Sequence, residues 1–266
     1  MPPSPEDEFI PFASPAPRVA RRFCTRCGSL LNDADPCGPC FARQSQASLL
    51  PSADDGGQRS TKGALTLYFS LLGVCVIGMF AGIAQASEIN IDIGVSVGIT
   101  TVVLIGVGMS WRNVLPLLKQ FPRAYWFGIA VGMSFLTIAI AVGVIRAFQH
   151  FAHVPEQRMS TPFLNAGYGW GWIVLFWCVQ PAIFEELAFR GTIMSALSRA
   201  LSPFETVLVS AMMFMILHLS PARFPHTFAL GLAAGYLRLR TRSLYPCILL
   251  HFCHNFACVG AEWANL

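Results

Sequence analysis

The chain has 266 residues, of which 54% are hydrophobic and only 12% are charged, and its formal net charge is +4. Soluble domains carry about 25% charged residues, so this composition excludes an ordinary soluble globular protein. Several apolar runs reach the roughly 20 residues that cross a bilayer, which predicts an all-α polytopic membrane protein. Its arginines gather beside those runs, which favours orientation in a bilayer over nucleic-acid binding.

The N-terminal part begins with residues 1–22, a Pro-rich stretch that we expect to be disordered. No apolar segment of a signal peptide occurs there. Residues 42–63 contain Ser, Gln, Asp and Gly and are predicted to be a linker. Between these two stretches lies a cysteine-rich segment, residues 23–41.

This segment contains two CxxC pairs, Cys24 with Cys27 and Cys37 with Cys40. Two such knuckles offer four thiolates, which predicts a tetrahedral structural zinc site that the metal itself stabilises. The segment resembles the short zinc ribbons at the ends of many bacterial proteins. We interpret it as a structural knuckle, and leave open whether it docks a protein partner. Intact thiols favour a reducing compartment, so we expect a cytoplasmic N-terminus in a bacterial cytoplasmic (inner) membrane.

Residues 64–266 are predicted to form a bundle of about seven transmembrane helices. We expect spans over residues 64–86, 91–111, 124–148, 167–189, 204–219, 226–239 and 244–263. The fourth helix is expected to continue to about residue 200, and Pro116 and Pro122 to break the segment between spans two and three. Basic residues at 112–123, 190–199 and 238–242 would then share the cytoplasmic side with the N-terminus. The short sixth span leaves six or eight crossings open.

Glycines four residues apart predict close helix packing. Such pairs occur at Gly78 and Gly82, Gly94 and Gly98, Gly128 and Gly132, and Gly231 and Gly235.

Two adjacent carboxylates, Glu185 and Glu186, end the uncharged run of the fourth span. A charge at mid-bilayer costs about 2.5–3.5 kcal/mol on insertion scales, so both acids need compensation. Arg190 lies four residues beyond Glu186 and can pair with it across one helical turn. Glu185 remains as the surplus charge and is the candidate for chemistry.

Two further motifs place polar groups four residues apart on later helices, Phe214 with His218 and His251 with Asn255. Glu185 lies roughly 17 residues before the Ser202 turn and His218 roughly 15 after it. At a rise of about 1.5 Å per residue, both groups should lie at similar depth. The height of His251 fits less well, and would need a tilted helix or a buried loop.

The double-Glu motif ending in Arg (EELAFR), the FMILH motif and the HFCHN motif follow one another on successive helices. In this order they resemble the CPBP family of intramembrane glutamic proteases, which includes the CAAX prenyl endopeptidases and Abi proteins. The resemblance covers about residues 165–260 and does not extend to the zinc ribbon.

The resemblance implies a membrane endopeptidase that hydrolyses a peptide bond with an activated water and needs no catalytic cofactor. It implies that Glu185 is the general base and that His218 holds the water. His251 and Asn255 would supply the oxyanion donors. Glu186, Arg190 and Phe214 would be structural or shape the substrate groove. The expected partners are the lipid bilayer and a membrane protein or peptide substrate, and the bacterial type of ribbon argues against prenylated substrates.

Three alternatives remain open from the sequence. Glu185, His218 and His251 could bind a catalytic zinc ion in a metalloprotease, although the chain lacks HExxH. The chain could instead be a non-enzymatic membrane scaffold or regulator with the zinc ribbon as its docking head. A proton-coupled transporter also uses buried Glu and His, but no paired repeats are present.

Overall fold

The computed structural model describes residues 22–23, 30–31, 53–153 and 158–264. The chain divides into two units, Met1–Ala53 and Asp54–Leu266. In the first unit, β1 (Arg22–Phe23) pairs antiparallel with β2 (Leu30–Leu31).

The predicted zinc ribbon is not tested by the structure. Its four expected ligands lie outside the described residues, namely Cys24, Cys27, Cys37 and Cys40. The ribbon and its structural zinc therefore stay predictions, and so does a protein partner docked on it.

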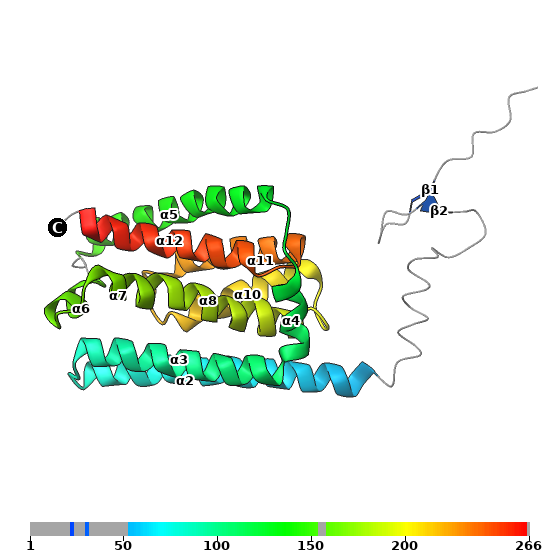
Figure 1. The fold of residues 1–266 in the computed structure, drawn as a ribbon, viewed down its shortest axis with the longest axis horizontal. Helices are drawn as coiled ribbons and strands as arrows, with labels where there is room; N and C mark the ends of the chain where they lie inside the picture. The colour runs from blue at the N-terminus through cyan, green and yellow to red at the C-terminus, as the bar shows by residue number, and fades with distance from the viewer. Residues whose placement is uncertain (1–21, 24–29, 32–52, 154–157, 265–266) are drawn as a thin grey trace, which may run out of the picture. The chain divides into compact units, whose positions relative to one another are not determined.

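The second unit is helical, and its elements follow the predicted spans (Figure 1). The first half contains α2 (Ala53–Ile83), α3 (Glu88–Met109), α4 (Trp111–Lys119), α5 (Tyr125–Ala152) and α6 (Thr161–Asn165). A continuous helix then runs over Trp170–Leu197. The chain ends in α10 (Pro203–Leu217), α11 (Phe224–Thr241) and α12 (Tyr245–Ala264).

The fold is an all-α polytopic membrane protein. Among the described residues, four helical segments are long and apolar enough to cross a membrane, namely Ser60–Ile83, Glu88–Met109, Tyr125–Phe151 and Trp170–Leu197. The helix α10 is apolar but shorter. Large apolar side chains lie exposed along the first three of these spans, including Phe69, Phe80, Leu104, Phe135 and Leu136. Such a surface is stable in contact with lipid tails.

Two boundaries differ from the predictions. The helix α2 begins at Ala53, inside the predicted linker. The prediction that Pro116 breaks its segment is wrong, since Pro116 lies inside α4. The chain leaves the helix only at Gln120, shortly before Pro122.

The helices pack in successive layers (Figure 1). The α2–α3 pair forms one edge, α8 packs against α3 and α12, and α5 covers α11 and α12 on the opposite edge. The buried core includes Val103, Phe189, Phe214 and Leu250, each contributed by a different helix. The central helix, which carries the double-Glu motif, is thus surrounded by other helices.

Glycine packing is confirmed on two interfaces. A Cβ on Gly231 would lie 2.9 Å from the Ala211 Cα, so α10 and α11 approach closely there. A Cβ on Gly78 would meet Val95 at 2.5 Å, which joins α2 to α3. The prediction is wrong for Gly94, Gly128 and Gly132, where nothing lies within 4 Å. For the last two, that face of α5 has no close neighbour among the described residues.

Candidate active site

The helix that carries the double-Glu motif changes its winding twice. It begins as α7 (Trp170–Val174), widens into the π-helix η1 (Leu175–Val179) and returns to α8 (Gln180–Glu186). It widens again in η2 (Leu187–Ile193) before α9 (Met194–Leu197). Single π turns within α-helices occur frequently at functional sites. The two carboxylates lie at the end of α8, between the two widened segments.

Glu186 is held by a buried network. Its Oε1 accepts a hydrogen bond from Arg190 Nη1 at 2.9 Å, which confirms the predicted i,i+4 pair. The Arg190 guanidinium also donates to the Gly231 carbonyl of α11 at 3.0 Å. Both side chains are fully buried, and the Arg190 Cζ lies 4.8 Å from the Phe214 ring centroid. A buried charge must be paired to be tolerated. Glu186 and Arg190 neutralise each other in this way.

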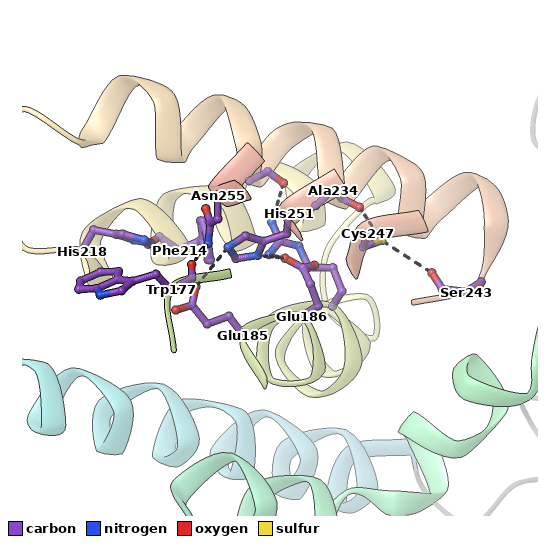
Figure 2. A network of polar contacts seen from close by, with 12 residues as sticks. Trp177, Glu185, Glu186, Phe214, His218, Ala234, Ser243, Cys247, His251 and Asn255 are labelled. Carbon is purple, nitrogen blue, oxygen red and sulfur yellow. Dashed lines mark hydrogen bonds and ion pairs between the residues drawn. The ribbon is translucent and has the colours of Figure 1, made fainter. Parts of the chain in front are cut away.

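His251 lies between the two carboxylates (Figure 2). Its Nδ1 lies 2.9 Å from Glu186 Oε1, and its Nε2 lies 4.0 Å from Glu185 Oε2. Because Glu186 Oε1 can only accept while it is ionised, the Nδ1 atom carries the proton of that hydrogen bond. The other ring nitrogen therefore faces Glu185. The imidazole is buried, with a side-chain exposure of 3%.

The expected mismatch in the depth of His251 does not arise. Glu185 is separated from the Ser202 turn by η2 and by the non-helical residues 198–201. A π-helix closes its hydrogen bonds over five residues and so advances less per residue than an α-helix. This winding shortens the helix between Glu185 and the turn, and His251 Nε2 lies 4.0 Å from Glu185 Oε2.

His218 makes its closest contacts with Phe214. It ends α10, and its Nδ1 lies 2.9 Å from the Phe214 carbonyl. Within the described residues, no hydrogen bond or ion pair joins His218 to Glu185. The Phe214 ring contacts both histidines, at centroid distances of 4.9 Å to His218 and 5.8 Å to His251. The structure therefore brings the two histidines to the same aromatic ring.

Asn255 lies one turn beyond His251 on α12, on the same face (Figure 2). Its Nδ2 donates to the Trp177 carbonyl of η1 at 3.0 Å. The four residues expected to act in catalysis thus come from three helices, as their spacing predicted. Glu185, His251 and Asn255 form one cluster, and His218 joins it through Phe214.

Buried polar atoms without a hydrogen-bond partner occur at this cluster. Among the described residues they include Glu185 Oε2, Glu186 Oε2 and Trp177 Nε1. An unpaired buried oxygen is costly, and both carboxylates carry one. The side chain of Glu185 keeps 14% of its surface exposed, whereas Glu186 keeps none.

Sequence reasoning missed several residues that hold the cluster together. The Trp177 carbonyl partners Asn255, and Arg238 Nε donates to the Arg190 carbonyl of η2 at 3.1 Å. The Cys247 thiol, one turn before His251, donates to the Ala234 carbonyl at 3.3 Å. One sequence signal could have pointed to the Trp177 carbonyl. Pro181 lies four residues later and has no N–H, so it cannot donate to that carbonyl within the helix.

The described part of the chain contains no group of three or more His, Cys, Asp or Glu side chains arranged to hold a metal ion. The set considered for a catalytic zinc is Glu185, His218 and His251. The Phe214 ring contacts both histidines and separates His218 from His251. These residues do not fit a metal centre as they are placed.

A pair of buried carboxylates beside a histidine, enclosed by apolar helices, defines a polar site within a membrane-embedded bundle. Residues 167–257 match the family model described as Rce1-like, Type II CAAX prenyl endopeptidase Rce1-like. This segment contains every predicted site residue outside the zinc ribbon, and the match confirms the resemblance to the CPBP family. No curated protein and no solved structure matches the chain. The match supports a membrane protease.

Proposed function

We propose that this protein is an intramembrane glutamic endopeptidase that hydrolyses a peptide bond in a membrane-associated protein or peptide. One observation carries the proposal: Glu185 Oε2 makes no hydrogen bond among the described residues, and it faces His251 Nε2 at 4.0 Å. Glu186, the neighbouring acid, is already paired with Arg190. Only one of the two carboxylates is available for chemistry.

The charges of the cluster support this division of roles. Glu186 and Arg190 cancel each other, so Glu185 is the surplus negative charge. When His251 is protonated on both nitrogens, it donates to Glu186 through Nδ1 and presents a second N–H toward the Glu185 side. The four groups then sum to zero charge, which a low-dielectric interior favours. A negative oxygen that develops beside His251 Nε2 would be stabilised by that N–H.

The reaction proceeds by general-base hydrolysis. Glu185 takes a proton from a water molecule, and the water oxygen attacks the carbonyl carbon of the substrate peptide bond. His251 and Asn255 donate hydrogen bonds to the resulting oxyanion, and His218 orients the water. The carbon–nitrogen bond then breaks, and the proton held by Glu185 passes to the leaving amine. No covalent enzyme intermediate is formed.

The test is a comparison of membrane proteomes from cells that express the wild type or Glu185→Gln. This substitution keeps the shape of the side chain and removes the base. One or more membrane proteins should accumulate uncleaved in the variant, with cleavage reduced by at least about 10²-fold. The exposed Glu88, at the start of α3, provides the matched control Glu88→Gln, which should process normally. Unchanged cleaved products in Glu185→Gln would contradict the proposal and favour a non-enzymatic scaffold.

A further inference from the structure

Pro181 changes the hydrogen bonding of the helix just before the double-Glu motif. The Gln180 N–H bonds to the Leu175 carbonyl, five residues back, in the π-helical pattern of η1. The next residue, Pro181, has no N–H. It can serve neither the Phe176 carbonyl, five residues back, nor the Trp177 carbonyl, four residues back. The helix therefore lacks one donor at the transition from η1 to α8.

The Trp177 carbonyl finds its partner on another helix. Asn255 Nδ2 of α12 donates to it at 3.0 Å (Figure 2). A carbonyl without a donor inside an apolar bundle is costly, and Pro181, four residues on, cannot donate to Trp177 as another residue in an α-helix would. The Asn255 amide supplies a hydrogen bond at this point. A side chain from α12 thereby replaces a backbone donor of the central helix.

The same hydrogen bond fixes the orientation of the Asn255 amide. The carboxamide has two N–H donors and one oxygen, and its oxygen cannot face another carbonyl oxygen. One N–H points at Trp177, so the second N–H is directed elsewhere in a defined geometry. Figure 2 shows Asn255 on the same face of α12 as His251 and directed toward Glu185 and Trp177.

We infer that Pro181 and the Trp177 carbonyl form a positioning element that orients Asn255 for catalysis. The inference rests on the proposed endopeptidase function, since it assigns the second Asn255 N–H to the oxyanion. Pro181 touches no reacting atom and acts only through Trp177 and Asn255. An Ala at position 181 would return a backbone N–H that competes for the Trp177 carbonyl and releases the amide.

The first arm of the test measures stability and needs no substrate. The melting temperature is measured in detergent for the wild type, Pro181→Ala, Asn255→Ala and the double variant. Asn255→Ala should lower the melting temperature of the wild type, because the Trp177 carbonyl loses its donor. The same change should lower it far less in the Pro181→Ala background. Equal losses in both backgrounds would overturn the inference.

The second arm measures cleavage of a peptide that spans the site identified by the Glu185→Gln comparison. Asn255→Ala should lower kcat by about 10²-fold, the loss typical of one oxyanion donor. Pro181→Ala should lower kcat about 3- to 10-fold with an unchanged KM, because only the orientation of the amide is lost. The double variant should be no slower than Asn255→Ala alone. Multiplicative losses, or an unchanged kcat in Pro181→Ala, would overturn the inference.

Pro116 offers a matched control. It also lies inside a helix, α4, and Pro116→Ala likewise returns a backbone N–H, but to a helix that carries no proposed catalytic residue. Its kcat should equal that of the wild type. If Glu185→Gln causes no substrate to accumulate, the proposed function fails, while the melting temperatures still decide whether Pro181 and Asn255 are coupled.

Discussion

The two π-helical segments belong to one helix and are separated only by α8, yet their surroundings differ. In η2, six of the seven residues are buried, and its hydrogen bonds involve charged side chains. Arg190 of η2 pairs with Glu186, and Arg238 of α11 donates to the Arg190 carbonyl. In η1 only Cys178 is fully buried, and the Trp177 carbonyl is served by a neutral amide. Glu186 is tied to η2 through Arg190, whereas Glu185 faces His251 of α12.

The difference shows how adjacent, chemically identical residues acquire separate roles. A fully buried ion pair resists change, because breaking it leaves a charge without compensation. A partly exposed segment with neutral hydrogen bonds can admit a substrate and adjust to it. We therefore expect substitutions around η2 to act mainly on stability, and substitutions around η1 to act mainly on catalysis.

The largest stability effect is expected from Glu186→Ala. It leaves the buried Arg190 guanidinium without its carboxylate and should lower the free energy of unfolding by about 3–5 kcal/mol. Reversible unfolding in mixed micelles, followed by tryptophan fluorescence, measures the change.

The neighbouring residue supplies the control for this experiment. Glu185→Ala makes the same chemical change but removes a carboxylate with an unpartnered buried oxygen. Its cost in unfolding free energy should stay clearly below that of Glu186→Ala, because the 4.0 Å contact of Glu185 with His251 is longer than the 2.9 Å pair of Glu186 with Arg190. Equal costs at the two positions would show that the two acids are not divided between structure and chemistry.

A smaller effect is expected from Arg238→Gln. This substitution removes the charged hydrogen bond from Nε to the Arg190 carbonyl and should cost about 1.5–3 kcal/mol of unfolding free energy. Arg240, two residues along α11, is exposed, and Arg240→Gln removes the same charge at a cost within about 0.5 kcal/mol. If both variants unfold alike, η2 does not depend on Arg238.

The sequence predicted those features that depend on spacing within one helix. The pairing of Glu186 with Arg190 follows from their separation by four residues, and so does the shared face of His251 and Asn255. The existence of the helices follows from their apolar runs. These predictions hold because local geometry repeats at every turn.

Features that depend on an interruption of the repeat were not predictable in the same way. The straight-helix estimate placed Glu185 and His218 at similar depth and left His251 at the wrong depth, because it could not include η2. Gly128 and Gly132 have the same spacing as Gly231 and Gly235, but the open face of α5 has no close neighbour among the described helices. Which helix lies opposite a motif is decided by tertiary packing.

The smallest effects come from the hydrogen bonds that tie each segment to its neighbours. Gln180 Nε2 donates to Thr100 Oγ1 at 3.0 Å and to the Ser96 carbonyl at 3.3 Å, which joins the η1 end of α8 to α3. Thr192 Oγ1 of η2 lies 3.0 Å from Ser110 Oγ. Gln180→Met and Thr192→Val should each cost about 0.5–1.5 kcal/mol of unfolding free energy.

Their effects on cleavage should nevertheless differ. Gln180 adjoins Pro181 and the end of η1, so Gln180→Met should lower kcat about 2- to 5-fold by loosening the segment that orients Asn255. Thr192→Val should leave kcat unchanged at temperatures where both variants are folded, because η2 acts on stability. Cleavage assays beside unfolding curves measure both quantities on the same preparations. An equal loss of kcat in Thr192→Val would mean that η2 also positions the reacting groups, and that the two segments act as one unit.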